Sequence, residues 1–182
     1  MCFWRFVAAE LSSGDLNHRV GYPVKRLVDI TLALLMLVLL APVVLFVALL
    51  VRLNMGPPIL FRQRRPGLGT TPFNILKFRT MLDAHGPDGK LRPDGERLTR
   101  LGTFLRRYSL DELPELVNVV KGEMSLVGPR PLVMEYLPFF TERERLRFRV
   151  LPGITGLAQV SGRNYLGWDE RLELDARYVE TI

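Results

Sequence analysis

The most strongly apolar part of the chain is the segment Leu32–Val51, whose 20 residues include no charged and no polar side chain. As a helix, such a segment would extend about 30 Å, which is close to the thickness of the hydrocarbon core of a bilayer. The pattern therefore predicts membrane insertion. A cleaved signal peptide is disfavoured, because the run is too long and no short basic leader precedes it.

Pro42 lies in the middle of this run and predicts a kink, because proline removes one helical hydrogen bond and clashes with the preceding turn. Two topologies fit: a kinked helix that spans the membrane, and a re-entrant helix–break–helix that enters and leaves by the same face. Both flanks are basic, with Lys25 and Arg26 before the run and Arg52 and Arg62 after it. Since basic residues favour the cytoplasmic side, the charges favour re-entry.

After the run, the polar and apolar pattern predicts an α+β domain that is mainly helical. Ile59–Phe61 and Phe73–Phe78 are typical of short strands, and the glycine- and proline-rich turn between them predicts a β-hairpin. Loops are expected over residues 84–95 and 151–164. The predicted helices are Leu98–Arg107, Asp111–Lys121, an arginine-rich helix that starts at a Thr141–Glu144 capping box, and Trp168–Val179.

Asp111 is the expected N-cap of its helix. With Asp111 in that position, Pro114 falls inside the first turn, where no hydrogen-bond donor is lost. Gly122 is expected to end the helix.

Composition narrows the function. The formal net charge is +6 and the pI is near 9.9, so the chain attracts anions such as nucleic acid, acidic lipid headgroups or phosphorylated small molecules. Cys2 is the one cysteine, and with two histidines it matches no zinc spacing. A metal here would be a hard cation held by carboxylates and substrate phosphates. Nucleic-acid binding has only the charge in its favour, because the arginines are scattered and no stacking-aromatic motif occurs.

The adjacent acids Asp111 and Glu112, next to Arg106 and Arg107, are the first candidates for chemistry. One carboxylate can attack phosphorus while the other holds a divalent cation. The alternative is structural, because Asp is a common N-cap and Glu is common in a first turn.

Four other candidates carry positive or polar groups. Arg130 lies between two prolines, which fix the backbone and pre-orient a guanidinium for phosphate, or simply make a rigid turn. Lys77 and Arg79 project to one face of a strand, either toward an anion or into solvent. The glycine-punctuated segments with Gln159 and with Arg163 offer amides and side chains to a nucleotide, or are ordinary turns.

Together these motifs resemble one family, the monotopic phosphoglycosyl transferases or bacterial sugar transferases, from about Lys25 to Tyr178. The matching motifs are Lys25-Arg26-Leu27-Val28-Asp29, the mid-run Pro42, Phe61-Arg62-Gln63 with Arg65 and Gly67, Lys77-Phe78-Arg79-Thr80-Met81, Ser109-Leu110-Asp111-Glu112-Leu113-Pro114, Gly128-Pro129-Arg130-Pro131, Pro152-Gly153-Ile154-Thr155-Gly156 and Gly162-Arg163-Asn164.

The resemblance implies a re-entrant membrane helix–break–helix with a small cytosolic catalytic domain, at the cytosolic face of the bacterial cytoplasmic membrane. It implies transfer of a sugar 1-phosphate from a UDP-sugar to a polyprenyl (undecaprenyl) phosphate, with Mg²⁺, to initiate glycoconjugate synthesis. Asp111 matches the family nucleophile and Glu112 the Mg²⁺-binding glutamate. Arg106 is expected at the phosphates, and Arg130 and Arg163 fall in motifs that face the same site.

The resulting division of the chain has three parts: an N-terminal interfacial segment (residues 1–22), the membrane segment kinked at Pro42 (residues 23–53) and the catalytic domain (residues 54–182). Residues 1–22 match nothing in the family, whose members usually continue for a short segment beyond the position of Ile182. Association into a homodimer within the membrane is compatible with such an anchor. The competing hypotheses are a non-catalytic basic module that binds anionic lipid or nucleic acid, and a bitopic structural protein.

Overall fold

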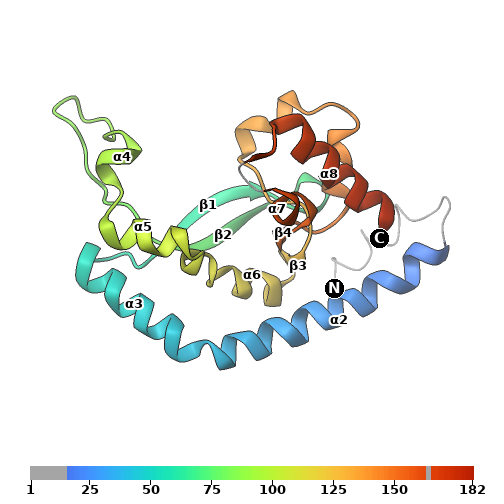
Figure 1. Cartoon of the computed structure of the whole chain (residues 1–182), viewed down its shortest axis with the longest axis horizontal. Coiled ribbons are helices and arrows are strands. Elements are labelled where there is room, and N and C mark those ends of the chain that lie inside the picture. Colours follow the sequence, from blue (N-terminus) through green and yellow to red (C-terminus); the bar gives the residue numbers. More distant parts are fainter. Residues whose placement is uncertain (1–15, 163–164) are drawn as a thin grey trace.

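A long, bent pair of helices runs along one side of the molecule, and a domain of short helices and two small sheets is seated on it (Figure 1). The computed structural model describes residues 16–162 and 165–182. The elements are α2 (Leu16–Leu39), α3 (Ala41–Met55), β1 (Leu60–Pro66), η1 (Leu68–Thr70), β2 (Pro72–Phe78), α4 (Asp94–Arg97), α5 (Arg100–Arg107), η2 (Leu110–Glu112), α6 (Glu115–Lys121), β3 (Ser125–Val127), η3 (Met134–Phe139), η4 (Glu144–Arg149), β4 (Gly153–Thr155), α7 (Leu157–Ser161) and α8 (Trp168–Thr181), where η marks a 3₁₀ helix.

The apolar run is divided between α2 and α3, which meet at Leu40 with a bend of 64°. Pro42 lies in the first turn of α3, where its missing amide costs no helical hydrogen bond. The kink predicted around Pro42 is therefore confirmed, with the break placed at Leu40. Among the described helices, none is by itself long and apolar enough to cross a membrane, whereas Tyr22–Leu39 and Ala41–Met55 taken together meet that criterion.

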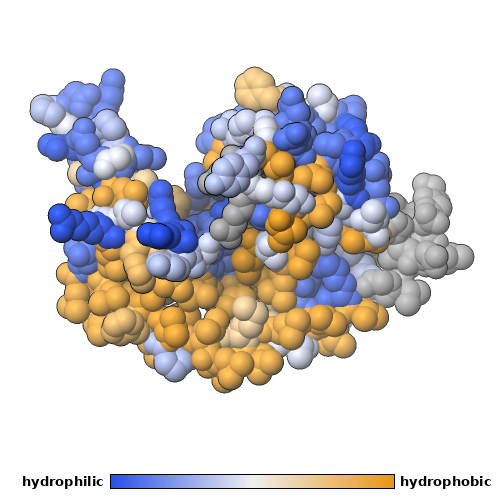
Figure 2. All heavy atoms as spheres, viewed as in Figure 1, coloured by the Kyte–Doolittle hydropathy of each residue, from blue (hydrophilic) through white to orange (hydrophobic). Residues whose placement is uncertain are grey.

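Apolar side chains cover the outer face of this helix pair. Leu35, Leu39, Leu45, Phe46 and Leu53 are each more than half exposed. Figure 2 shows a continuous apolar band along this side of the molecule, while the part of the domain farthest from α2 and α3 is mainly hydrophilic. An apolar surface of this extent marks a face that contacts a membrane or another apolar partner.

Two hydrophobic clusters join the domain to the bent pair. Ala33 of α2 packs with the buried β2 side chains Phe73 and Ile75, and with α6. Val47 and Val51 of α3 pack in a second cluster. Because β2 contributes side chains to both clusters, packing against the domain fixes both arms of the bend.

The predicted hairpin is confirmed. β1 and β2 pair antiparallel from Leu60 opposite Phe78 to Pro66 opposite Pro72, so the strands are longer and the connection shorter than predicted. Gly67 and Gly69 lie in that connection, and Gly69 adopts a positive φ of 57°. The mainly helical α+β class is likewise confirmed. The helices predicted over Leu98–Arg107 and Trp168–Val179 are found as α5 and α8.

Two of the sequence-based predictions are wrong. The segment Asp111–Lys121 is not one helix, because only α6 from Glu115 onward is α-helical and Asp111 lies in η2 rather than at an N-cap. Pro114 is the N-cap of α6, where its ring and missing amide end the 3₁₀ turn. Residues 151–164 are not simply a loop, because they include β4 and α7.

The strand β4 pairs with β3 in parallel, and glycine permits the close approach around this pair. A Cβ on Gly153 would lie 2.1 Å from the backbone nitrogen of Gly128. A Cβ on Gly156 would lie 2.2 Å from the carbonyl oxygen of Gly128. Gly153 and Gly156, which suggested a loop in the sequence, are therefore needed because their backbone lies too close to that of Gly128 to leave room for a side chain.

The predicted capping box is confirmed, with the Thr141 amide donating to Glu144 Oε2 at 2.7 Å, but the segment that follows is the 3₁₀ helix η4. The stretch 84–95 contains a bridge between His85 and Leu91 and the beginning of α4 at Asp94. Most of the N-terminal interfacial segment expected over residues 1–22 lies outside the described residues, and α2 begins at Leu16.

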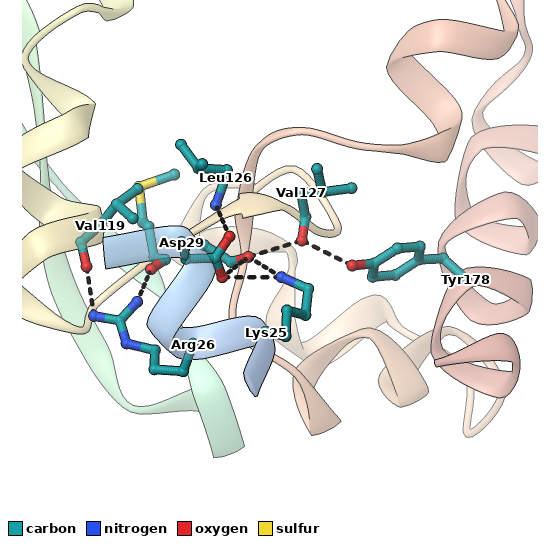
Figure 3. A network of polar contacts seen from close by, with 9 residues as sticks. Lys25, Arg26, Asp29, Val119, Leu126, Val127 and Tyr178 are labelled. Carbon is teal, nitrogen blue, oxygen red and sulfur yellow. Dashed lines mark hydrogen bonds and ion pairs between the residues drawn. The ribbon is translucent and has the colours of Figure 1, made fainter. Parts of the chain in front are cut away.

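Polar contacts fasten α2 to the domain at Asp29, which is 5% exposed (Figure 3). Its Oδ2 accepts hydrogen bonds from Lys25 Nζ at 3.0 Å and Ser125 Oγ at 2.7 Å. Its Oδ1 accepts from the Leu126 amide at 3.2 Å. Arg26, which directly follows Lys25 in α2, donates to the carbonyl oxygen of Met124 at 2.9 Å. The apolar helix is thus joined to β3 by buried, charge-assisted bonds.

Replacing Asp29 by alanine should destabilise the fold by about 2–4 kcal/mol, because Ser125 and the Leu126 amide lose their acceptor and Lys25 its counter-charge. The midpoint of thermal unfolding in detergent should fall by roughly 5–15 °C. Tyr178→Phe is the control, since it removes one exposed hydrogen bond to the Val127 carbonyl. Equal, small shifts for both variants would contradict the assigned role of Asp29.

Candidate active site

The acidic pair Asp111–Glu112 lies in η2, in a tight turn between α5 and α6. Ser109 enters this turn with a positive φ of 55°, which reverses the chain after α5. Leu110 and Leu113 pack against the cluster of Val47 and Val51, so the two acids lie between anchored apolar residues. Asp111 is 8% exposed.

Glu112 accepts two charge-assisted hydrogen bonds. Lys77 Nζ from β2 lies 2.7 Å from Glu112 Oε1, and Arg130 Nη2 donates to the same oxygen. Burial alone would raise the pKa of Glu112, but the hydrogen bond and charge of Arg130, with those of Lys77, lower it below its usual value. Glu112 is therefore held as a carboxylate.

Asp111 has the opposite shift. Burial raises its pKa, the charge of Lys77 opposes that effect, and the neighbouring Glu112 carboxylate adds to it. Its oxygens are poorly hydrated yet lie among cations. That environment favours a carboxylate that acts as a nucleophile toward an anionic electrophile.

A third acid, Glu115, completes the cluster and was missed by sequence reasoning. It is 2% exposed, and its Oε1 lies 3.1 Å from Lys77 Nζ. Burial raises its pKa to about 7, although Lys77 lowers it. The signal was its spacing of three residues from Glu112, which places the two acids on one face of a helical turn.

The structure separates the side chains of Lys77 and Arg79. Lys77 bridges Glu112 and Glu115, as described. Arg79 instead donates to the carbonyl oxygens of Gly56 at 2.9 Å and Pro57 at 3.0 Å, where α3 ends. Arg79 thus binds the C-terminal carbonyls of the apolar helix and is not brought to the acidic cluster.

Two other arginines adjoin the cluster. Arg106 Nε donates to the buried Thr80 Oγ1 at 3.0 Å, and the charge of Arg106 lowers the pKa of Asp111. Arg65 Nη1 donates to the carbonyl oxygen of Pro131 at 3.3 Å. Burial, and then the charge of Arg130, lower the pKa of Arg65. Arg65 was noted in the sequence only as part of a motif, and the structure places it beside Arg130.

The remaining predicted site residues are Gln159 and Arg163, and the structure describes only the first of them. Gln159 lies in α7, and both polar atoms of its amide are buried without a hydrogen-bond partner. A Cβ on Gly156 would lie 2.9 Å from Gln159 Oε1, so the Gln159 amide lies beside the point where Gly156 approaches the backbone of Gly128. Arg163 lies outside the described residues.

The donor set fits an open Mg²⁺ site rather than a closed one. Within residues 16–162 and 165–182, no three or more His, Cys, Asp or Glu side chains are arranged to hold a metal. Mg²⁺ needs only one or two carboxylates when substrate phosphates complete its coordination. Lys77 and Arg130 both bind Oε1 of Glu112. Oε2 of Glu112 accepts no hydrogen bond from the described residues. Glu112 and Asp111 therefore provide the oxygen ligands that such an ion prefers.

Comparison with known proteins places the chain among the bacterial sugar transferases. The family described as bacterial sugar transferase matches residues 20–182. The chain is 51% identical over 156 residues to the "Uncharacterized sugar transferase EpsL" of Bacillus subtilis, covering 86% of this chain and 77% of that protein.

Two further relatives carry the name UDP-glucose:undecaprenyl-phosphate glucose-1-phosphate transferase. The Caulobacter vibrioides protein is 43% identical over 169 residues, covering 86% of this chain and 62% of that protein. The Escherichia coli protein is 40% identical over 165 residues, covering 85% of this chain and 36% of that protein. The chain therefore spans only part of the length of these two relatives.

The pKa of Glu115 predicts a pH-dependent stability. Because the folded-state pKa of about 7 exceeds the ordinary value of 4.5, the folded protein binds this proton more tightly than the unfolded chain does. Its contribution to stability is complete below pH 4.5 and is lost as the pH rises through 7. As the pH rises over this window, the free energy of unfolding of the wild type should fall by about 1–3 kcal/mol relative to that of Glu115→Gln.

The measurement is the unfolding midpoint of both proteins at half-unit steps of pH, compared as a difference so that other groups cancel. The control is Glu142→Gln, at an exposed glutamate, which should follow the wild-type profile. A constant difference between wild type and Glu115→Gln across this window would contradict the assignment.

Proposed function

The chain belongs to the bacterial sugar transferase family, and from this premise we propose that it is a phosphoglycosyl transferase. It moves a sugar 1-phosphate from a UDP-sugar to a polyprenyl phosphate through a covalent intermediate on Asp111, the first step of glycoconjugate synthesis. The observation that carries the proposal is the buried Asp111 carboxylate amid Lys77, Arg106 and Glu112, with Arg130 paired to Glu112. The two relatives named as glucose-1-phosphate transferases support the substrate classes.

The first half-reaction is an attack by an Asp111 carboxylate oxygen on the phosphorus that bears the sugar. The bond from this phosphorus to the oxygen bridging it to the nucleoside phosphate breaks, and that electron pair leaves with uridine monophosphate. Attack of an anion on an anionic diphosphate requires neutralisation of charge. Arg106 and Arg130 supply cations at this position, and Lys77 keeps the neighbouring acids neutralised.

The second half-reaction regenerates the enzyme. An oxygen of the polyprenyl phosphate attacks the phosphorus of the aspartyl phosphosugar, and the Asp111–phosphorus bond breaks to return the carboxylate. The product is a polyprenyl diphosphate sugar. Because one product leaves before the second substrate reacts, the kinetics should be ping-pong.

Mg²⁺, held by Glu112 with Asp111 nearby, would neutralise diphosphate charge and orient the leaving group. The amide of Gln159, which lacks a partner in the described residues, is available for the nucleotide. Arg163 is assigned to the same substrate by its family motif alone. Arg79 has a different role, because it binds the end of α3.

We place α2 and α3 in the cytosolic leaflet of the bacterial cytoplasmic membrane as a re-entrant pair. The apolar outer face, the 64° bend and the basic residues on both flanks support this placement. In this orientation the acidic cluster lies at the cytosolic interface, where a soluble donor and a lipid acceptor meet.

Site-directed labelling tests the topology. In a Cys2→Ser background, Val24→Cys in α2 and Asn54→Cys in α3 lie on either side of the apolar run, and both positions are exposed. An impermeant maleimide should label both only after the cytosolic face is made accessible, as in inside-out vesicles. Labelling of the two positions from opposite sides would show that the pair spans the membrane.

Release of uridine monophosphate tests the reaction. Solubilised protein is mixed with Mg²⁺, a panel of UDP-sugars and a polyprenyl phosphate. Asp111→Asn should abolish release, a loss of at least about 1000-fold, because an amide is not a competent nucleophile. Asp83→Asn is the matched control, since this aspartate is exposed and should leave the rate unchanged.

Undiminished release by Asp111→Asn would refute the covalent mechanism. Absence of release by wild type with every donor, together with salt-sensitive binding to anionic vesicles, would favour the non-catalytic basic module instead.

A further inference from the structure

A buried ion pair outside the acidic cluster joins α8 to η4. Arg147 of η4 and Asp175 of α8 are each 4% exposed, and Arg147 Nη2 lies 3.0 Å from Asp175 Oδ2. Burial raises the pKa of Asp175 to about 6 and lowers that of Arg147, so the environment opposes both charges. An ion pair in such a position contributes little net stability compared with well-packed apolar residues. Its presence therefore calls for a role besides packing.

The same nitrogen of Arg147 also reaches the acidic cluster through the backbone. Arg147 Nη2 donates to the carbonyl oxygen of Arg130, whose own guanidinium donates to Glu112 Oε1. Asp175 thus orients Arg147, Arg147 holds the backbone at Arg130, and Arg130 contacts the catalytic pair.

Three consecutive carbonyl oxygens of this loop are each held by a different donor. The Gly153 amide donates to Pro129 at 2.9 Å, Arg147 donates to Arg130, and Arg65 donates to Pro131 at 3.3 Å. Pro129 and Pro131 have no amide hydrogen and fix only their own φ, so donors from other elements to these carbonyls add the contacts that hold the loop against the rest of the domain. Arg147 binds the central carbonyl, which belongs to Arg130, and the guanidinium of Arg130 contacts Glu112.

A purely structural role as a clamp between α8 and η4 is the alternative. Exposed ion pairs already join this region, because Arg143 at the start of η4 contacts Glu173 at 2.6 Å and Glu180 at 3.0 Å. These pairs do not touch the loop that carries Arg130. They therefore provide a matched control that connects the same elements without the bond to Arg130.

We propose that Arg147, oriented by Asp175, is a positioning residue that fixes the Arg130 backbone, so that the Arg130 guanidinium is held in place for the phosphates of the donor. The proposal rests on the proposed function for its kinetic consequence. Its structural consequence, the immobilisation of Arg130, can be measured whether or not the reaction is the one proposed. Misplacement of such a group by about 1 Å is sufficient to reduce rates by up to about a hundredfold.

The test uses two variants that remove the guanidinium bound to the Arg130 carbonyl but keep α8 in place by different means. Arg147→Lys retains the charge opposite Asp175. The double variant Arg147→Met with Asp175→Leu replaces the pair by apolar side chains, a change that buried ion pairs commonly tolerate. Arg143→Gln is the control. Thermal unfolding in detergent identifies which variants are folded.

The kinetic readout is kcat/KM for the donor, measured by nucleoside monophosphate release. Both folded variants should lose about tenfold or more, while the KM for polyprenyl phosphate changes less than twofold and Arg143→Gln matches wild type. The second readout is the rate at which phenylglyoxal modifies Arg130, followed by peptide mass spectrometry. This rate should rise at least threefold in both variants, because a displaced guanidinium leaves Glu112.

The outcomes separate the two hypotheses. A folded double variant with wild-type kcat/KM and wild-type Arg130 reactivity would overturn the proposal and leave the pair as a structural clamp. If wild type shows no transfer, the proposed function fails, and the phenylglyoxal rates alone decide whether Arg147 positions Arg130. If the double variant does not fold, Arg147→Lys decides by the same two readouts.

Discussion

Three carboxylates in or next to one short turn form the constraint around which this domain is arranged. Asp111, Glu112 and Glu115 lie within five residues of sequence and are largely buried. Charges so close and so poorly hydrated repel one another unless cations lie between them. Lys77 arrives from the hairpin and Arg130 from the loop after β3, so neutralising the acids also fixes the positions of both segments.

Backbone contacts extend that constraint to the rest of the fold. Asn118 of α6 is fully buried, accepts from the Leu76 amide at 3.0 Å and donates to the Asn74 carbonyl oxygen at 2.8 Å. These two bonds fix β2 against α6 just before the position from which Lys77 extends. Asp29 does the same for α2 and β3. The apolar pair, the hairpin and the acidic turn are therefore one connected assembly, and the distance of the site from the apolar face is set by it.

The sequence predicted those elements whose signal is local. The long apolar run with Pro42, the hairpin and the final helix each have a periodicity or a turn composition that few other structures share, and all are found. The helix assigned to Asp111–Lys121 is found only from Glu115, because capping statistics do not anticipate a left-handed Ser109. The parallel pair β3–β4 has three residues in each strand, too few for a pattern, and it depends on contacts distant in sequence.

The same distinction applies to the site. Asp111, Glu112, Lys77 and Arg130 were identified by motif, and the structure brings them together. Arg79 follows Lys77 at the spacing of one strand face, yet its guanidinium binds carbonyls at the end of α3, a partner that no local pattern reveals. Glu115 had only its spacing from Glu112 as a sequence signal, and Arg147 had none. Their importance comes from burial and from partners contributed by other elements.

The balance of charge in the cluster bears on how an acidic site could accept the anionic substrate of the proposed reaction. Lys77, Arg106 and Arg130 oppose the three carboxylates, so these six groups together have no net charge when all are ionised, and Arg65 lies beside them. With a pKa of about 7, Glu115 is partly protonated near neutral pH, and the cluster then has a net positive charge. A phosphate group placed beside it favours that protonated form, because like charges raise the pKa of a carboxyl group. In the proposed reaction, binding of the donor phosphates would therefore be linked to proton uptake by Glu115, and the third acid would adjust the charge of the site to that of the substrate.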